Sequence, residues 1–327
     1  MPDAKNGLLS HNRGNWASKI VKMANQQNAI VLFIILMLIC FSALTPNFFT
    51  FKNLMNIVRQ ISVTAFVAFG MTFVILIAGI DLTVGSTVCA AAIVAAVVNL
   101  STHSLLMTIA AALTAGTIIG AASGLIIVAI GIPDFIVTLA MMSIVRGIVM
   151  VYTKAVPIYG FEQNYFFLGQ GYLGPIPFPV VLAVVVFLAG YIVLKFTRFG
   201  RHVYAVGGSR EVARLAGIDI KRVRVIVYAI SGFMAALCGL VLSSRTAAAV
   251  PTSGVGYEMD AIASVVLGGT YLFGGKGSIL GTLLGLTVLG ILSNGLILIG
   301  VNPFYVTIVK GVVLLIAISV SKSAAKD

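Results

Sequence analysis

Hydrophobic runs close to the length of a membrane span recur along the chain and are separated by short polar segments. A helix that crosses a bilayer needs roughly 20 mostly apolar residues. About ten runs approach that length, and they cover residues 29–45, 61–80, 82–100, 105–130, 135–153, 179–195, 223–243, 261–275, 279–300 and 304–320. The run at 261–275 is short enough to be a re-entrant segment. The pattern predicts an all-α polytopic membrane protein with about ten transmembrane segments.

The composition agrees with this pattern, because little of the chain suits an aqueous surface. Of the 327 residues, 60% are hydrophobic and 9% are charged, and the mean hydropathy is +1.10. A soluble fold cannot bury this much apolar surface. Cys40, Cys89 and Cys238 all fall inside apolar runs. We expect them to be buried thiols rather than a disulfide framework.

The net charge of +12 at first suggests a protein that binds nucleic acid, but the distribution of the charge argues against such a partner. The basic residues gather before the first run, around one central polar segment and at the end: Lys5, Arg13, Lys19 and Lys22; Lys195, Arg198, Arg201, Arg210, Arg214, Lys221, Arg222 and Arg224; Lys322 and Lys326. Basic segments of bacterial membrane proteins stay in the cytoplasm. All three regions, and so both termini, are therefore expected to be cytoplasmic.

This topology divides the chain into a membrane domain and two tails. We expect a cytoplasmic tail over 1–28, a transmembrane domain over 29–320 with a cytoplasmic loop at 197–222, and a second cytoplasmic tail over 321–327. The first apolar run starts later than the core of a cleavable signal peptide, so it is expected to be a retained span. On the outer side, residues 51–61 predict a short helix on the membrane surface, and residues 154–179 predict an irregular loop.

The central polar segment contains a candidate short helix. Ser209 is a suitable N-cap, and Glu211 in the first turn is favourable at the positive end of the helix dipole. Arg214 is spaced to pair with Glu211, and Gly217 is a suitable terminator. So short a helix is marginal in water and needs a surface to dock on. An ordinary charged loop fits the same residues equally well.

Three formal charges fall within or between the spans, namely Asp81, Arg146 and Lys310. Such residues are costly in a membrane, so each is expected to have a partner. Asp81 can cap a helix that begins at Leu82. It can also pair with Arg146 or Lys310 and hold a broken helix, which the adjacent glycines Gly79 and Gly85 would suit. Direct contact with a polar solute is the third alternative.

No catalytic or metal-binding arrangement is recognisable. The three histidines are scattered over a tail, an outer loop and the central segment, without the spacing of metal ligands. The glycine-rich stretch around Lys276 does not match a phosphate-binding loop, because Thr270 stands at the first glycine and Gly277 follows the lysine. We therefore expect no bound cofactor and no enzyme activity. If the chain pumps, another protein supplies the energy.

Several motifs together resemble the membrane permeases of bacterial sugar importers of the ATP-binding cassette (ABC) class, especially the ribose-type branch. They are "LTPNFFTFKNLMNI" (44–57), "GMTFVILIAGIDLTVGS" (70–86), "RGIVMVYT" (146–153), "TRFGRHVYAVGGSREVARLAGI" (197–218), "GVGYEMDAIASVVLGGTYLFGGKGSILGT" (254–282) and "NGLILIGVNPFYVTIVKG" (294–311). The resemblance extends in order from about Ala43 to Ile318. Each motif alone is ordinary apolar sequence, but six in register are specific.

The resemblance implies an assembly with other proteins. It implies a second permease copy or a paralogue, two cytoplasmic ATPase subunits that hydrolyse ATP with magnesium, and a periplasmic sugar-binding protein that delivers a ribose-like pentose or related hexose. It also implies that Glu211, Ala213, Arg214 and Gly217 dock on the ATPase. Bulky Tyr271 and Phe273 depart from the family pattern and are candidates for lining the path.

A rival interpretation needs no ATPase. It is a proton-coupled secondary transporter or facilitator in which Asp81 carries the proton.

Overall fold

The computed structural model describes the backbone of residues 14–323 and the side chains of residues 27–316. In chain order its elements are α1 (Gly14–Leu44), α2 (Phe51–Leu76), α3 (Val84–Thr102), α4 (Leu105–Ile130), α5 (Asp134–Thr153), the 3-10 helix η1 (Gln163–Phe166), α6 (Phe167–Gln170), β1 (Tyr172–Leu173), β2 (Ile176–Pro177), α7 (Phe178–Phe196), α8 (Arg198–Gly208), α9 (Arg210–Leu215), α10 (Ile220–Thr246), α11 (Tyr257–Leu267), α12 (Ile279–Leu298) and α13 (Pro303–Ser323). The predicted tails 1–28 and 321–327 lie largely outside the side chains described.

The helices confirm an all-α polytopic membrane protein. Within the described residues, α1 from Gln27, α2, α3, α4, α5, α7, α10 and α12 are long and apolar enough to cross a bilayer. The described side chains of α13 add a shorter apolar stretch, Pro303–Ile316. By contrast α11 has 11 residues and is only about 16 Å long, so it cannot cross the bilayer as a helix. The predicted span at 261–275 is therefore a half-length helix followed by a loop rather than a full helical span.

The outer connections are more ordered than the sequence predicts. The surface helix expected at 51–61 is not separate, because α2 runs unbroken from Phe51 to Leu76. No proline or glycine interrupts residues 51–69, so nothing ends the helix there. Thr50 caps it, accepting a hydrogen bond from the Asn53 amide. The loop at 154–179 contains η1, α6 and the antiparallel pair of β1 and β2.

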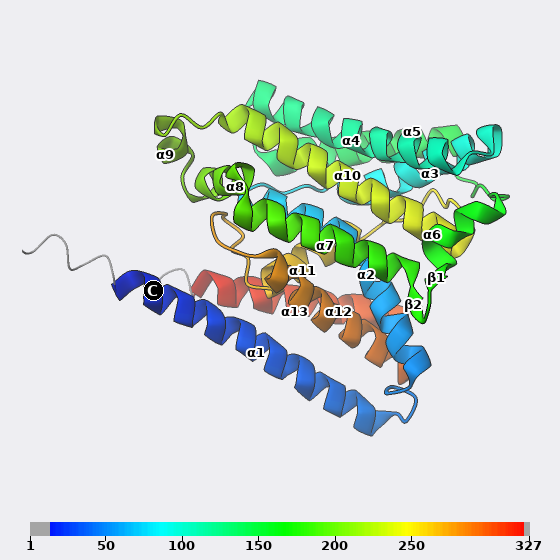
Figure 1. Ribbon diagram of the computed structural model, residues 1–327, viewed down its shortest axis with the longest axis horizontal. Helices are drawn as coiled ribbons and strands as arrows, with labels where there is room; N and C mark the ends of the chain where they lie inside the picture. Colours follow the sequence, from blue (N-terminus) through cyan, green and yellow to red (C-terminus); the bar gives the residue numbers. More distant parts are fainter. Residues whose placement is uncertain (1–13, 324–327) are drawn as a thin grey trace, which may run out of the picture.

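Helix α10 lies at the centre of the bundle and packs against α2, α3 and α4. Figure 1 shows α4 and α10 side by side along much of their length. Glycines allow this contact: a Cβ atom at Gly120 would lie 2.2 Å from the Tyr228 carbonyl oxygen, and one at Gly232 would lie 2.1 Å from that of Gly116. Small residues permit such close approach in lipid, where packing rather than water expulsion holds helices together.

A separate apolar cluster joins α1 to α12 and the start of α2, and it includes Phe41, Phe48 and Ile57. Cys89 and Cys238 are free and buried, as expected, but Cys40 is exposed. The expectation for Cys40 was wrong because α1 packs on one side only. In Figure 1 the start of α1 and the end of α13 lie at the end of the molecule that carries α8 and α9.

The glycine contact between α4 and α10 leads to a stability prediction. Gly120→Ala should lower stability by about 1–3 kcal/mol, the usual cost of forcing an extra methyl into a packed interface. Gly147→Ala in α5 is the matched control, since no described atom lies within 4 Å of its Cβ position and alanine favours a helix over glycine. Thermal unfolding midpoints in one detergent should fall only for Gly120→Ala. Equal midpoints would contradict the close contact.

Candidate functional site

The chain leaves the helical conformation between α2 and α3, at residues 77–83, and Asp81 lies in this break. Its side chain is completely buried. Oδ1 accepts hydrogen bonds from the backbone amide and the hydroxyl of Thr83, and Oδ2 accepts one from the Ser231 hydroxyl at 2.7 Å. Helix α3 begins at Val84, so Asp81 stabilises the turn before the helix instead of capping a helix at Leu82.

The expected salt bridges of Asp81 are absent from the described structure. Arg146 Nη1 donates instead to the backbone carbonyl oxygens of Pro251 and Ser253, at 3.0 and 2.9 Å. Lys310 Nζ pairs with Asp260 Oδ2 at 2.8 Å. The prediction was wrong because neutral donors on α10 and in the turn supply the hydrogen bonds that Asp81 needs.

A second buried carboxylate, Asp134, escaped the sequence analysis. Its Oδ1 pairs with Arg224 Nη2, and its Oδ2 accepts a hydrogen bond from the Tyr228 hydroxyl at 2.7 Å. The hydroxyls of Tyr228 and Thr138 also donate to the Ile80 carbonyl oxygen, at 3.4 and 3.1 Å. These contacts tie the break at 77–83 to α5 and α10. The available signal was the pair of opposite charges at the ends of two apolar runs.

Gly79 and Gly85 both lie at crowded positions near the break. A Cβ atom at Gly79 would lie 2.8 Å from the Tyr228 hydroxyl and 2.9 Å from Asp134 Oδ2. One at Gly85 would lie 2.3 Å from Glu258 Oε2. Their role in the structure is therefore to make room for polar groups of other helices.

The central polar segment forms the short helix that its sequence allows. Ser209 Oγ accepts a hydrogen bond from the Val212 amide, and Gly217 adopts a left-handed conformation (φ 77°) after the helix. Ala213 is buried, whereas Val212 and Leu215 are 64% and 80% exposed. The expected ion pair between Glu211 and Arg214 does not form in the described structure. Helix α9 thus presents an apolar surface that its own chain leaves uncovered.

Helix α8 connects this region to the interior of the bundle. The Tyr204 hydroxyl donates to the Gly277 carbonyl oxygen at 3.0 Å, in the loop between α11 and α12. A Cβ atom at Gly207 would lie 1.7 Å from the Leu76 carbonyl oxygen. The same oxygen accepts a hydrogen bond from the Gly275 amide at 2.9 Å. The end of α2, the end of α8 and the loop at 268–278 therefore meet at one point.

The two bulky residues proposed for the path lie in this loop. The rings of Tyr271 and Phe273 are 5.3 Å apart, and Phe273 is 63% exposed. They do not line the polar recess between α2, α11, α12 and α13, which surrounds the pair of Asp260 and Lys310. We define the polar recess by its lining residues, which are Gln60, Ile61, Thr64, Asp260, Ser264, Leu286, Leu289, Gly290, Ser293 and Lys310.

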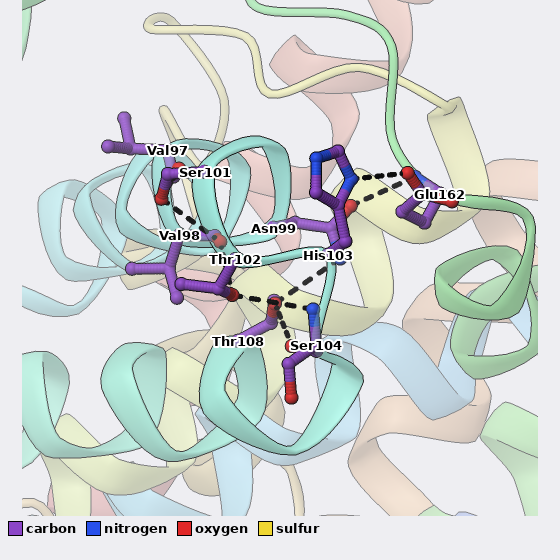
Figure 2. A network of polar contacts seen from close by, with 9 residues as sticks. All are labelled: Val97, Val98, Asn99, Ser101, Thr102, His103, Ser104, Thr108 and Glu162. Carbon is purple, nitrogen blue, oxygen red and sulfur yellow. Dashed lines mark hydrogen bonds and ion pairs between the residues drawn. The ribbon is translucent and has the colours of Figure 1, made fainter.

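At the end of the molecule opposite α8 and α9, a polar network anchors the loop before α7 (Figure 2). Asn99 donates to the Thr108 hydroxyl at 3.2 Å and accepts from the Glu162 amide at 2.9 Å. His103 Nδ1 lies 2.6 Å from Glu162 Oε1. Nearby, the Tyr165 hydroxyl donates to the Leu240 carbonyl oxygen, and burial raises the pKa of this phenol. The loop is thereby fixed to α3, α4 and α10.

A family model described as a permease component of branched-chain amino acid transport systems matches residues 53–318. The chain belongs to this permease family. Ribose import permease protein RbsC of Escherichia coli (strain K12) is 45% identical over 303 residues, which are 91% of this permease and 94% of that protein. RbsC of Haemophilus influenzae is 43% identical over 297 residues, 90% and 92% of the two chains.

More distant relatives carry other names. D-allose transport system permease protein AlsC of E. coli (strain K12) is 36% identical over 289 residues, 88% of each chain. No solved structure matches the permease. The comparisons confirm the resemblance seen in the motifs and do not favour the proton-coupled alternative. The permease is a multi-pass integral membrane protein and a transport subunit rather than a catalyst.

The buried pair of Asp134 and Arg224 leads to a second prediction. Arg224→Ala should destabilise the permease by about 3–5 kcal/mol, because it leaves a buried carboxylate without its charge partner. Arg222→Ala is the matched control two positions earlier, since Arg222 forms only an exposed pair with Asp219 at 4.0 Å, and such pairs contribute about 0–1 kcal/mol.

The yield of folded protein in membranes and the unfolding midpoint should both fall for Arg224→Ala alone. The double variant Asp134→Ala/Arg224→Ala should recover part of the loss, since no uncompensated charge remains. Equal behaviour of the two arginine variants would show that the buried pair is unimportant.

Proposed function

We propose that the permease is the membrane-spanning subunit of an ABC importer that moves a ribose-like monosaccharide across the bacterial inner membrane. The observation that carries this proposal is the identity of 42–45% to ribose import permeases over about nine-tenths of the chain. Relatives named for allose and L-arabinose reach only 36% and 35%. Ribose is therefore the first candidate substrate, followed by related pentoses and hexoses.

The proposed orientation places α8 and α9 in the cytoplasm, together with both termini. Two observations support it: the basic residues concentrate around these helices, and the start of α1 and the end of α13 lie at the same end of the molecule (Figure 1). The chain would then cross the membrane ten times. One of these crossings would consist of α11 and the loop that follows it.

Helix α9 is proposed to be the contact with the ATPase. A helix of six residues that exposes Val212 and Leu215 needs a partner to cover them. A push on α9 would pass to α8, and from there through Tyr204 and Gly207 to the loop at 268–278 and the end of α2. The partner ATPase subunits would bind and hydrolyse ATP with magnesium, and this chain would bind no cofactor.

The complete assembly would contain a second copy of the permease or a paralogue, two ATPase subunits and a periplasmic binding protein. That protein would deliver the sugar at the end of the molecule opposite α9. Because it would select the solute, the path itself could remain weakly polar, which agrees with the few charges inside the bundle.

Uptake of labelled D-ribose tests the function directly. Cells that express the permease with its cognate ATPase and binding protein should accumulate D-ribose, and cells without the permease should not. Accumulation should persist when an uncoupler removes the proton gradient while cellular ATP is maintained, because ATP hydrolysis is the proposed driving force. Loss of uptake with the gradient alone would favour the proton-coupled rival.

A charge placed on α9 tests the coupling contact. Leu215→Asp should abolish most D-ribose uptake and reduce co-purification of the ATPase at least about tenfold, because a buried unpaired charge at an interface costs several kcal/mol. Tyr159→Asp is the control for ATPase co-purification, since Tyr159 is also exposed, at 63%, but lies in the outer loop. Normal ATPase binding by Leu215→Asp would place the contact elsewhere.

A further inference from the structure

The polar recess holds an ion pair that the proposed mechanism does not yet use. It is a small, partly open recess between α2, α11, α12 and α13. Lys310 Nζ and Asp260 Oδ2 lie 2.8 Å apart, and the two side chains are 25% and 28% exposed. Gln60 lines the same space. The pair is thus neither sealed in the protein nor at an outer surface.

The depth of the recess limits what it can face. Gln60 and Lys310 lie nine and seven residues after the first residues of α2 and α13, and these helices begin at the end of the molecule opposite α8 and α9 (Figure 1). At 1.5 Å per residue these positions are about 13 and 10 Å along their helices, in stretches that are apolar enough to lie in a membrane. A partly exposed ion pair at this depth is costly against lipid tails. It therefore faces water or a polar solute.

The free hydrogen-bonding capacity of the recess is matched to hydroxyl groups. In the described structure Asp260 Oδ1 and the Gln60 amide have no hydrogen-bond partner, and Lys310 uses one of its three donors, on Asp260. By contrast the hydroxyls of Ser264 and Ser293 already donate to carbonyl oxygens of their own helices. A carboxylate, an ammonium group and an amide together can accept from and donate to adjacent hydroxyls of one sugar ring.

We propose that Asp260, Lys310 and Gln60 form a hydroxyl-binding subsite in the outer half of the translocation path. This inference rests on the proposed function and names the residues that the moving sugar contacts. Between sugars the ion pair closes on itself and keeps both charges satisfied. The hydroxyls of a passing sugar replace part of the contact between Asp260 and Lys310. The two charges therefore never face the membrane interior without partners.

The test uses the complete complex in proteoliposomes, with binding protein and D-ribose, and measures ribose moved per ATP hydrolysed. Asp260→Asn, Lys310→Met and Gln60→Leu should each lower this ratio, the first two at least about tenfold, as expected when a hydrogen bond to a charged group is lost. Ser143→Ala is the control outside the recess, because this hydroxyl on α5 is likewise bound to its own helix. Its ratio should stay within about twofold of the unmodified complex.

The double exchange Asp260→Lys/Lys310→Asp separates a subsite from a structural latch. It preserves an ion pair but reverses the donors, so the ratio should remain low. Restoration of the ratio by the exchange would overturn the subsite, as would a proportional fall of transport and ATP hydrolysis in the single variants. Failure of the unmodified complex to move D-ribose is a different result, and it would overturn the proposed function itself.

Water access provides a readout independent of transport. In a Cys40→Ala background, Gln60→Cys should react with a charged methanethiosulfonate reagent about tenfold or more faster than Ile118→Cys, because a charged reagent is excluded from lipid. Ile118 is 61% exposed near the middle of α4. Equal rates at the two positions would show that the recess is dry and would refute the proposal.

Discussion

The backbone of residues 77–83 is buried inside a bundle that lies in lipid, so its polar groups need partners within the protein. Asp81 accepts a hydrogen bond from the Thr83 amide, and hydroxyls from α5 and α10 donate to the Ile80 carbonyl oxygen. Two carboxylates organise this break: Asp81 is held by Ser231, and Asp134 is paired with Arg224. Removal of any one of these groups would leave its buried partners without hydrogen bonds, which is costly. The network therefore links the break to α5 and α10.

The break also positions the parts proposed to move. Because α2 ends at Leu76, the Leu76 carbonyl oxygen is free for another segment, and it accepts a hydrogen bond from the Gly275 amide beside Gly207 of α8. Three chain segments far apart in the sequence thus meet without an intervening side chain. Because these backbones are in direct contact, we expect a displacement of α8 to pass to the end of α2 and to the loop before α12.

The architecture was largely predictable because span-length apolar runs are a strong signal, and the caps at Thr50 and Ser209 follow from local chemistry. Partners across the bundle were not. Opposite charge alone favours Arg146 or Lys310 as the partner of Asp81, whereas its long-range partner is neutral Ser231, 150 positions away. Asp134 and Arg224 were overlooked at the ends of apolar runs, and the glycines after Leu267 that end α11 early were included in a span. The recess escaped notice because its residues come from four helices.

The contact between α4 and α10 limits how these two helices can move relative to each other during transport. Gly116, Gly120 and Gly232 bring the two backbones together with no flexible side chain between them, so sliding of one helix past the other would meet immediate steric resistance. Helices α3, α4 and α10 should therefore move together as one rigid unit during transport.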